Sequence, residues 1–417
     1  MLPRRRELDC AVISSASTSP ALAAIKDLDL RLRTWLCGAA LPLWLKAGFD
    51  AQTGRFAETL SIDEALAPGS GMVRARVAPR QIYSLIEGTR LGFKDPEALN
   101  MAAKGMAYFR DTYLDERDLV INAVSIDAKT RDTAFDLYNQ AFALFGLATA
   151  ANAFPARTAD LLARADRTLL QLLREYAHPA GGFHEANPPR APLCSNPHMH
   201  MLEACLAMED AGGGMRWRDL ADQIATLALT RFIDPATGAL HEFFTLDWSL
   251  PEDPAKQAVE PGHQFEWAWL LLTWARRRGR TAEVLPVAVR LVEIGETCGV
   301  DPARDAAFMS LNADLSPRDT VARLWGQTEW LKAGIALAET LAETLAETPN
   351  GEKREEALAS ILRAGKALET YLDVPLRGLW RDKWRADGSF VDEPAPASSL
   401  YHIVCAISCL AAFARTF

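Results

Sequence analysis

A chain of 417 residues with 49% hydrophobic and 24% charged residues has the composition of a globular protein with ample material for a core. Its formal net charge of −9 argues against a broad surface for nucleic acid or an anionic membrane, because both require a basic patch. No uninterrupted apolar run approaches the ~18 residues that a membrane span requires. We therefore expect neither nucleic acid nor a membrane as a partner.

The N-terminus, MLPRRRELDCAVISSASTSP, is basic and then serine-rich, and it lacks the apolar stretch of a secretory signal. We interpret residues 1–26 as a flexible extension and residues 27–417 as one domain, because no long Pro/Ser/Gly linker divides the rest. Seven scattered cysteines, without a CxxC pair, indicate reduced thiols rather than a disulfide framework. These features predict a cytoplasmic protein.

Apolar residues recur at helical spacing through almost the whole chain, for example in DLYNQAFALFGLATAAN and TADLLARADRTLLQLLREY. Alternating β-branched stretches typical of strands are scarce. The periodic segments predict about twelve helices, near residues 27–47, 77–92, 96–114, 132–152, 157–176, 195–211, 216–232, 257–278, 282–297, 317–347, 352–371 and 396–415.

A turn pattern recurs after alternate helices: a glycine, an aromatic or apolar residue, and a nearby acid, as in TGRFAE (53–58), AGGFHE (180–185), TGALHE (237–242) and RGLWRD (377–382). The glycines at 54, 182, 238 and 378 are 128, 56 and 140 residues apart, close to two, one and two units of about 60–70 residues. A helical hairpin of that length buries its apolar face only by stacking on its neighbours. The pattern predicts an all-α fold, a six-hairpin (α/α)6 toroid.

The segment ALAETLAETLAETPN (336–350) is a short tandem repeat in which Leu337, Leu341 and Leu345 lie four residues apart. This spacing puts one leucine stripe on one face of a helix. We interpret the segment as an extended outer helix.

The first candidate for chemistry is VEPGHQFEWAWLL (259–271). A Pro-Gly turn places His263 in the first turn of a helix, with Glu266 three residues on and on the same face. A carboxylate beside an imidazole fixes its tautomer and raises its basicity, as a general base needs. The pattern also fits a helix-capping Glu266 beside a structural His263.

A second histidine, His402, lies in SSLYHIVCAISCL (398–410), where Ser398 or Ser399 is expected to cap the helix and His402 to sit in its first turn. A third segment, SNPHMHMLEA (195–204), holds His200 and Glu203 at the same His-x-x-Glu spacing. Two such pairs raise a metal site as an alternative, but the Cys and His spacing typical of zinc is absent, so we predict no metal.

The remaining candidates are polar or aromatic residues near the expected helix starts. Arg80 in RARVAPRQIYSL is suited to a sugar hydroxyl, an enediolate oxygen or a phosphate, and equally to a surface ion pair. The further candidates for substrate binding are Tyr138, Asn196, His200, Trp325, Glu329 and Trp380. Trp325 and Trp380 could form stacking surfaces for a sugar ring, although tryptophan is more often a core residue.

Taken in order, RQIYSL, DLYNQAF, NPHMHMLEA, EPGHQFEWAWLL, LWGQTEW and ASSLYHI resemble the N-acylglucosamine 2-epimerase family, over about residues 30 to 415. The resemblance implies an α/α toroid with His263 and His402 as the catalytic pair, Glu266 orienting His263, and Arg80 in the pocket. A histidine at position 200 and the form of the last segments look most like the mannose or mannose-6-phosphate isomerase branch. Gly326 departs from that branch, which often has proline there.

The resemblance also implies metal-independent and cofactor-free chemistry, in which an aldose such as D-mannose becomes a ketose such as D-fructose through a cis-enediol. His402 is assigned as the base at C2 and His263 as its acid/base partner, and both are expected to titrate near neutrality. Arg80 and His200 would bind the oxygens at C1 and C2. The expected partner is a monosaccharide, and dimers are frequent in the family, so a homodimer is a further expectation.

Alternatives remain at this point. Mannose 6-phosphate as substrate, or a 2-epimerase that returns the proton to the opposite face of C2, would use the same intermediate. A toroidal glycoside hydrolase or lyase needs two carboxylates across the scissile bond, which a histidine-rich site disfavours. A non-catalytic sugar-binding toroid is disfavoured because both His263 and His402 are present.

Overall fold

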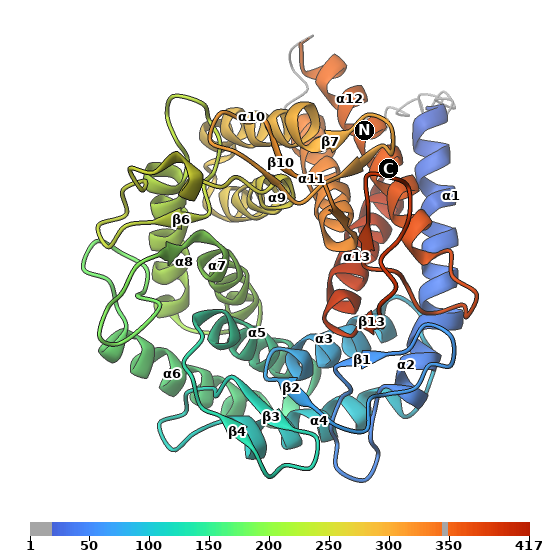
Figure 1. Cartoon of the computed structure of the whole chain (residues 1–417), viewed down its shortest axis with the longest axis vertical. Helices are drawn as coiled ribbons and strands as arrows, with labels where there is room; N and C mark the ends of the chain where they lie inside the picture. The colour runs from blue at the N-terminus through green and yellow to red at the C-terminus, as the bar shows by residue number, and fades with distance from the viewer. Residues whose placement is uncertain (1–18, 344–348) are drawn as a thin grey trace, which may run out of the picture.

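The computed structural model describes residues 19–343 and 349–417. Within these ranges, six helices surround the centre of the molecule: α3 (Val77–Arg90), α5 (Leu137–Ala153), α7 (Ser195–Asp210), α9 (Pro261–Arg278), α11 (Leu324–Glu343) and α13 (Ser398–Thr416). Each contacts the next in this order, and α13 contacts α3, so the contacts close into a ring (Figure 1).

An outer layer of helices packs against this ring. It consists of α1 (Pro20–Trp35), which continues through η1 (Leu36–Ala40) into α2 (Leu41–Ala47), α4 (Ala98–Tyr113), α6 (Thr158–Glu175), α8 (Met215–Leu227) with η3 (Ala228–Phe232), α10 (Thr281–Gly299) and α12 (Pro349–Leu372). Outer helices α4 to α12 each pack on the inner helix that precedes them, whereas α1 packs on α13 from the other end of the chain. This arrangement agrees with the expected six-hairpin toroid.

Two boundaries differ from the expectation. Helix α1 begins at Pro20, and Ile25 is fully buried, so residues 20–26 belong to the outer layer rather than to a flexible extension. The leucine-rich segment from residue 336 ends the inner helix α11, where Leu337 and Leu341 are buried, and is not an outer helix. Residues 1–18 and Leu345 lie outside the described residues.

Burial separates the two layers. In the inner helix α5 almost every residue from Asn139 to Ala151 is buried, whereas the outer helix α6 buries one face, formed by Leu161, Ala165, Thr168, Leu169 and Leu172. Helix α13 is long and apolar enough by composition to cross a membrane, and 67% of its apolar window is buried inside the protein. Its contacts with α1, α3 and α11 account for its apolar surface.

The recurring turn is present at the four predicted positions and at two more. Gly54, Gly182, Gly238 and Gly378 all have positive φ, between 74° and 106°. Asp118 and Asp305 take the same role, with φ of 61° and 50°, at the ends of α4 and α10. Aspartate is one of the few side chains that tolerate this conformation, so the turn recurs without its glycine. Asp118 lies 64 residues from both Gly54 and Gly182, so it divides the 128-residue interval between these glycines into two units of the expected length.

Glutamines of the inner helices hold three of these turns in place. Gln140 accepts a hydrogen bond from the Val120 amide at 2.9 Å and donates to its carbonyl at 2.7 Å. Gln264 and Gln327 make the same pair of bonds to Leu240 and Ala307. Because all three glutamines are buried, these bonds fix the loops relative to the starts of the inner helices.

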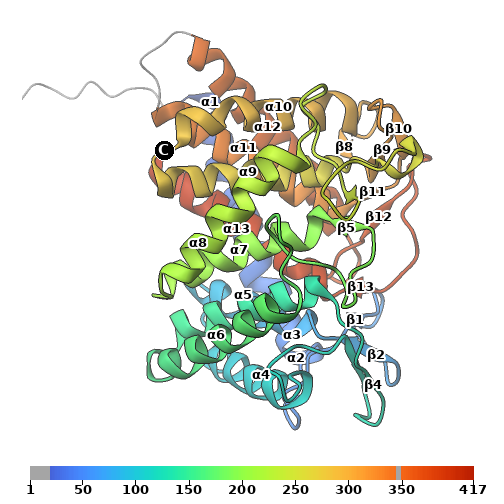
Figure 2. The same ribbon diagram turned by 90° about the vertical axis from the view of Figure 1, so that its left-hand side faces the viewer.

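Short strands, which an all-α expectation omitted, gather at the end of the ring where the inner helices begin (Figure 2). The antiparallel pairs are β1 (Thr59–Leu60) with β13 (Ala395–Pro396), β2 (Met72–Arg74) with β3 (Ala123–Ser125), β3 with β4 (Arg131–Asp132), β5 (Leu193–Cys194) with β6 (Phe243–Phe244), β7 (Val300–Asp301) with β8 (Ala306–Ala307), β9 (Ser310–Leu311) with β10 (Pro317–Asp319), and β11 (Ala322–Arg323) with β12 (Lys383–Trp384). Two 3-10 turns, η2 (Pro155–Arg157) and η4 (Pro254–Lys256), complete the loops. The β1–β13 pair joins the loop after α2 to the segment that leads into α13.

The cysteines show no pairing in the part of the chain described. Cys37, Cys194, Cys205, Cys298, Cys405 and Cys409 are free thiols, in agreement with the expectation of reduced cysteines. Cys10 lies outside the described residues.

Candidate active site

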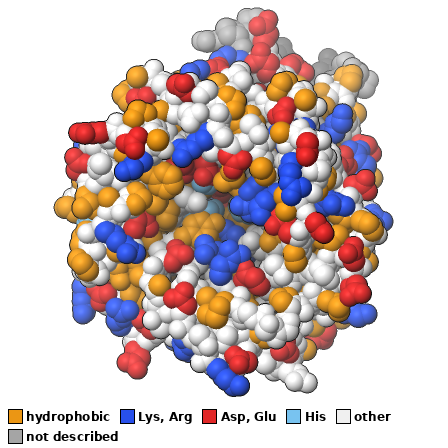
Figure 3. All heavy atoms as spheres, viewed as in Figure 1, with side chains coloured by type: hydrophobic (Ala, Val, Ile, Leu, Met, Phe, Trp, Pro, Cys, Tyr) orange, Lys and Arg blue, Asp and Glu red, His pale blue; other side chains and the backbone are white. Residues whose placement is uncertain are grey.

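A cavity of about 440 Å³ opens at the centre of the strand-bearing end. Figure 3 shows this hollow, with basic side chains around its mouth and histidine inside it. The cavity is lined by residues at or near the starts of all six inner helices. Since a helix carries partial positive charge at its N-terminus, these six ends favour an electron-rich ligand or a developing oxyanion there.

Most of the predicted site residues meet in this cavity. Its lining includes Arg80, Tyr138, Asn196, His200, His263, Glu266, Trp325 and His402. Glu329 lies below the surface of the cavity and is fully buried. Trp380 does not belong to the site, because its ring stacks on Trp44 at 4.9 Å and packs edge-on against Trp35 in the outer layer.

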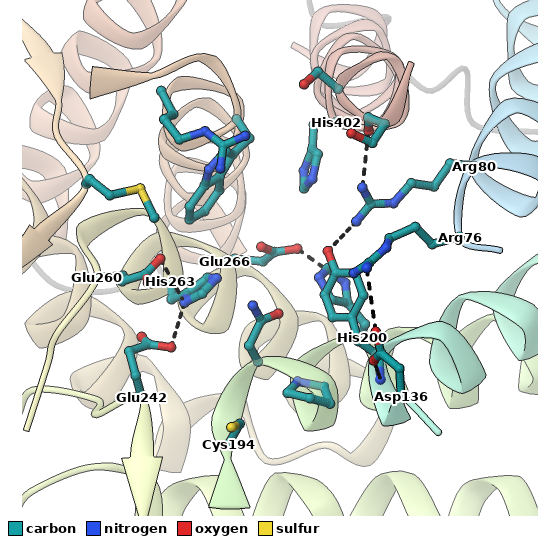
Figure 4. A pocket seen from close by; sticks show the side chains of 18 of the residues that line it. Arg76, Arg80, Asp136, Cys194, His200, Glu242, Glu260, His263, Glu266 and His402 are labelled. Atoms are coloured by element: carbon teal, nitrogen blue, oxygen red, sulfur yellow. Dashed lines mark hydrogen bonds and ion pairs between the residues drawn. The ribbon is translucent and has the colours of Figure 1, made fainter. Parts of the chain in front are cut away.

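His263 is the third residue of α9, which begins with Pro261 and Gly262. Its Nδ1 lies 2.8 Å from the Glu242 carboxylate and 3.5 Å from that of Glu260 (Figure 4). Among the described residues no hydrogen bond or ion pair joins His263 to Glu266, whose carboxyl lies 3.8 Å from His200 Nδ1 instead. The expectation that Glu266 orients His263 is therefore wrong, and Glu242 has that place.

His402 is the fifth residue of α13 and lies across the cavity from His263 (Figure 4). Its Nδ1 is 2.8 Å from Oε1 of Glu329, whose other oxygen is 2.6 Å from the Lys332 ammonium. Both Glu329 and Lys332 are fully buried, and Lys332 also lies 3.7 Å from the ring centre of Trp269. The expected serine cap of this helix is absent: Ala397 is the N-cap, and Ser399 donates to Asp382 instead.

Trp325 connects the two histidines. Its ring centre lies 4.9 Å from that of His263 and 6.1 Å from that of His402, so both imidazoles border the same indole. Gly262 makes this position available, because a Cβ there would come within 2.4 Å of Trp325 Cζ3. Neither histidine Nε2 has a hydrogen-bond partner among the described residues, and both residues line the cavity. Nε2 is thus the atom available to a ligand.

The electrostatic surroundings give the two histidines opposite protonation states. Burial lowers the pKa of His263, but the Glu242 and Glu260 carboxylates outweigh this and raise it to about 10. Burial lowers the pKa of His402 well below its usual value, and the charges of Arg80 and Lys332 add to this. At neutral pH, His263 is an imidazolium and His402 a neutral imidazole, so the expectation that both titrate near neutrality is wrong.

His200 and Glu266 form the floor between the histidines. His200 Nδ1 lies 3.3 Å from Glu203 and 3.8 Å from Glu266, and Tyr401 donates to the other oxygen of Glu203. Burial lowers the pKa of His200 to about 3. Burial and repulsion by Glu329 raise the pKa of Glu266 well above its usual value, and its carboxyl oxygens have no hydrogen-bond partner in the described ranges. The raised pKa favours the protonated form of Glu266, which can donate a hydrogen bond to a ligand oxygen.

Arg80 enters the cavity from α3. It donates to the Tyr138 hydroxyl and, at 3.4 Å, to the Ser398 carbonyl, and its guanidinium lies 3.9 Å from the ring centre of Phe142. These contacts fix its direction, while no carboxylate among the described residues pairs with it. An unpaired buried cation of this kind is suited to an anionic oxygen in the cavity.

Three groups of side chains have donor atoms close enough to hold a metal ion: His200, Glu203 and Glu266; Glu242, Glu260 and His263; and Glu266, Glu329 and His402. In the first group Glu203 is engaged by Tyr401, and in the third Glu329 is engaged by Lys332. A neighbouring ammonium competes with a metal for the same carboxylate. The expectation of metal-independent chemistry stays a prediction.

Several residues of the site escaped the sequence analysis, among them Glu242, Lys332 and Arg76. Glu242 had a signal, since it is the acid of the third turn motif, TGALHE. The acids of the other glycine turns have related positions: Glu58 contacts Arg74, Glu185 accepts from the Cys194 amide, and Asp382 contacts Arg323. Each faces a segment that leads into an inner helix, and Glu242 is the one of the four that lines the cavity.

Comparison with known proteins agrees with this architecture. The sequence profile of N-acylglucosamine 2-epimerase (GlcNAc 2-epimerase) matches residues 56–406. The chain belongs to the N-acylglucosamine 2-epimerase family. As a member, it is an enzyme of the isomerase and epimerase class.

Similar proteins and solved structures match this chain over nearly its whole length. A mannose-6-phosphate isomerase of Rhizobium meliloti (strain 1021) is 50% identical over 378 residues, which are 90% of this chain and 95% of the relative. The fold matches the cellobiose 2-epimerase of Spirochaeta thermophila DSM 6192 with a TM-score of 0.80 at 19% identity, over 96% of this chain and 99% of that one. A D-mannose isomerase structure matches with a TM-score of 0.78 at 17% identity, over 97% and 100%.

Proposed function

We propose that the protein is an aldose–ketose isomerase acting on a sugar of the mannose type. The observation that carries the proposal is the pairing of a neutral imidazole, His402, with an imidazolium, His263, at opposite sides of one cavity. Isomerisation needs a base at a carbon-bound proton and an acid at the adjacent carbonyl oxygen, both in reach of one substrate. The name of the relative at 50% identity supports the same reaction.

The reaction begins with the ring-opened aldose. Nε2 of His402 removes the proton from C2 while Nε2–H of His263 protonates O1, which gives the cis-enediol. His402 then returns its proton to C1, and the neutral His263 takes the proton from O2, which becomes the carbonyl of the ketose. A hydrogen has left C2 and one has been added at C1, and both histidines regain their initial states. The proton held on Nε2 of His402 exchanges with solvent while the enediol is bound, so C1 gains deuterium in deuterated water.

Negative charge develops on O1 as the C2 proton leaves, and on O2 when its own proton leaves in the second step. Arg80 supplies a fixed cation without a carboxylate partner, and Glu266, as a neutral acid, supplies a proton for a further hydrogen bond. Donors that are already in position need no reorganisation as charge develops. His200 and Tyr138 border the same volume, with ring centres 4.8 Å apart.

The test is to incubate the protein with D-mannose, and separately with mannose 6-phosphate, in deuterated water containing EDTA, and to follow the products by NMR. We expect the ketose as product, deuterium at the transferred position, and turnover that survives EDTA. Glucose or glucose 6-phosphate as the main product would instead identify a 2-epimerase, and loss of activity with EDTA would show a need for metal. A protein that binds the sugar but neither converts it nor exchanges its C2 hydrogen would contradict the proposal.

A further inference from the structure

One wall of the cavity carries three arginines in a row. Arg80 belongs to the first turns of α3, Arg76 is the residue before that helix, and Arg74 ends β2. All three line the cavity. Their exposure rises from the floor to the mouth: Arg80 is 4% exposed, and the side chains of Arg76 and Arg74 are 20% and 43% exposed. The three guanidiniums thus form a ladder from the reacting end to the solvent.

The ladder is not neutralised by its neighbours. Arg74 is held by Glu58, whose Oε1 accepts from its Nε at 2.6 Å. Arg76 has a single carboxylate contact, to Asp136 at 3.5 Å, and its buried Nε has no hydrogen-bond partner within the described residues. Because Arg80 adds a third cation without a carboxylate, positive charge exceeds negative charge along this wall, although the chain as a whole has a net charge of −9.

Arg76 is held in place without being saturated. Its guanidinium lies 4.9 Å from the ring centre of Tyr138, a contact with its flat face that leaves the N–H groups not facing Asp136 available at the edge. Figure 4 shows Arg76 and Arg80 entering the cavity side by side from the same wall. An arginine with free donors and an excess of local positive charge is suited to a dianionic ligand.

The spacing along the wall matches the length of a hexose. Four residues separate Arg76 from Arg80, which corresponds to about 6 Å along a helix at 1.5 Å per residue. The four carbon–carbon bonds between C2 and C6 of an open-chain hexose span about 5 Å. A hexose whose C1 and C2 oxygens lie at Arg80 is therefore long enough to reach toward Arg76 with its sixth carbon.

We propose that Arg76 is the main ligand of a phosphate-monoester site at the rim of the cavity, and that the substrate is a hexose 6-phosphate rather than the free sugar. The inference rests on the proposed function for the position of the reacting end. Arg74 adds to the field at this rim. Arg323, on the other side of the mouth, is not the anchor, because Asp382 engages it through two nitrogens at 2.9 and 3.0 Å.

The experiment compares kcat and KM for mannose 6-phosphate and D-mannose in the wild type, Arg76→Gln and Arg323→Gln. Loss of a charge-assisted hydrogen-bonding pair is expected to lower kcat/KM for the phosphorylated sugar about 10- to 100-fold in Arg76→Gln. The ratio of kcat/KM for the two sugars should fall in the same proportion. Arg323→Gln, which also removes a cation from the lining, should change this ratio much less. Arg76→Lys, which keeps the charge, should be intermediate.

A second measurement separates this inference from the proposed function. Mannose 6-phosphate is titrated into each variant in a calorimeter, with inorganic phosphate as a competitor, so that binding is read without turnover. Binding that weakens in Arg76→Gln, in a protein that converts neither sugar, supports the site while contradicting the isomerase. Turnover of both sugars with a ratio that Arg76→Gln leaves unchanged overturns the site while the isomerase stands. Circular dichroism on each variant confirms that it is folded.

Discussion

His263 and His402 each contact a buried glutamate, but their wider surroundings shift the two imidazole pKa values in opposite directions. Each imidazole has its Nδ1 2.8 Å from a buried glutamate, Glu242 in one case and Glu329 in the other. Around His263 a second carboxylate, Glu260, adds to the first. Around His402, Lys332 is bonded to the same glutamate at 2.6 Å. In both histidines the glutamate at Nδ1 fixes the tautomer. The charge beyond that contact, the Glu260 carboxylate for His263 and the Lys332 ammonium for His402, decides the protonation state.

This difference has a chemical consequence. A carboxylate at Nδ1 holds the proton on that nitrogen and leaves Nε2 toward the cavity, whatever the charge of the ring. Where a further carboxylate follows, the imidazolium is stabilised and Nε2 carries a proton to donate. Where an ammonium and a guanidinium follow, the neutral ring is stabilised and Nε2 has a free lone pair. One local motif thus supplies the acid and the base of a single reaction.

The largest expected effect is the loss of either imidazole. His402→Ala and His263→Ala should each lower kcat about 10²–10⁴-fold, the usual contribution of a positioned acid or base. Deuterium exchange at C2, measured by NMR, should be lower in His402→Ala than in His263→Ala, because only His402 removes the carbon-bound proton. Melting temperatures close to that of the wild type serve as the control for folding. Equal activity in wild type and His402→Ala would falsify the assignment.

Removing the ammonium should make the surroundings of His402 more like those of His263. Lys332 lowers the pKa of His402, so Lys332→Met should raise that pKa and move the acid limb of kcat/KM to higher pH. Glu329 is left as an uncompensated buried carboxylate, which costs about 3–5 kcal/mol of stability. The matched control is the double variant Glu329→Gln with Lys332→Met, which removes both charges and should recover most of the lost melting temperature. An acid limb that stays in place in Lys332→Met would contradict this account.

Removing a carboxylate should have the reverse effect on His263. Glu242 raises the pKa of His263, so Glu242→Gln should lower it and move the basic limb of kcat/KM down from about 10. The imidazolium must be present to protonate O1, and activity is lost as pH rises through this pKa. At pH values above both the old and the new pKa, activity should fall about tenfold for each unit by which the pKa is lowered. Glu260→Gln, 3.5 Å from the ring instead of 2.8 Å, is the control with the smaller shift.

The helices and the two histidines could be predicted from the sequence because their signals are local. Apolar periodicity marked the inner and outer helices, and His263 and His402 each stand near the start of an apolar helix. The glycine pattern missed the two turns in which Asp118 and Asp305 replace glycine. It was defined by a residue type, whereas the fold requires only a positive φ at that position.

The charge partners were harder to predict because they come from distant parts of the chain. Glu242 lies 21 residues before His263, and Glu329 lies 73 residues before His402. Glu266 was chosen for its spacing on the helix, but the ring nitrogen of His263 bonds Glu242 from a preceding loop, and Glu266 lies near His200 instead. Trp380 was a candidate because a tryptophan can stack on a sugar ring, yet its ring faces the outer layer, where it packs on Trp44 and Trp35.

The smallest expected effect concerns the spacing between the imidazole rings of His263 and His402, which both border Trp325. A Cβ at residue 262 would lie 2.4 Å from Trp325, whereas a Cβ at residue 326, in the first turn of the next inner helix, meets nothing closer than Ala307 at 3.9 Å. Gly262→Ala should therefore displace the indole that both histidines border and lower kcat/KM about tenfold, because small misplacements of reacting groups are costly. Gly326→Ala should leave kcat/KM unchanged and add about 0.5–1 kcal/mol of stability, as alanine for glycine does within a helix. If both variants keep full activity, the indole does not set the distance between acid and base, and the charges alone distinguish His263 from His402.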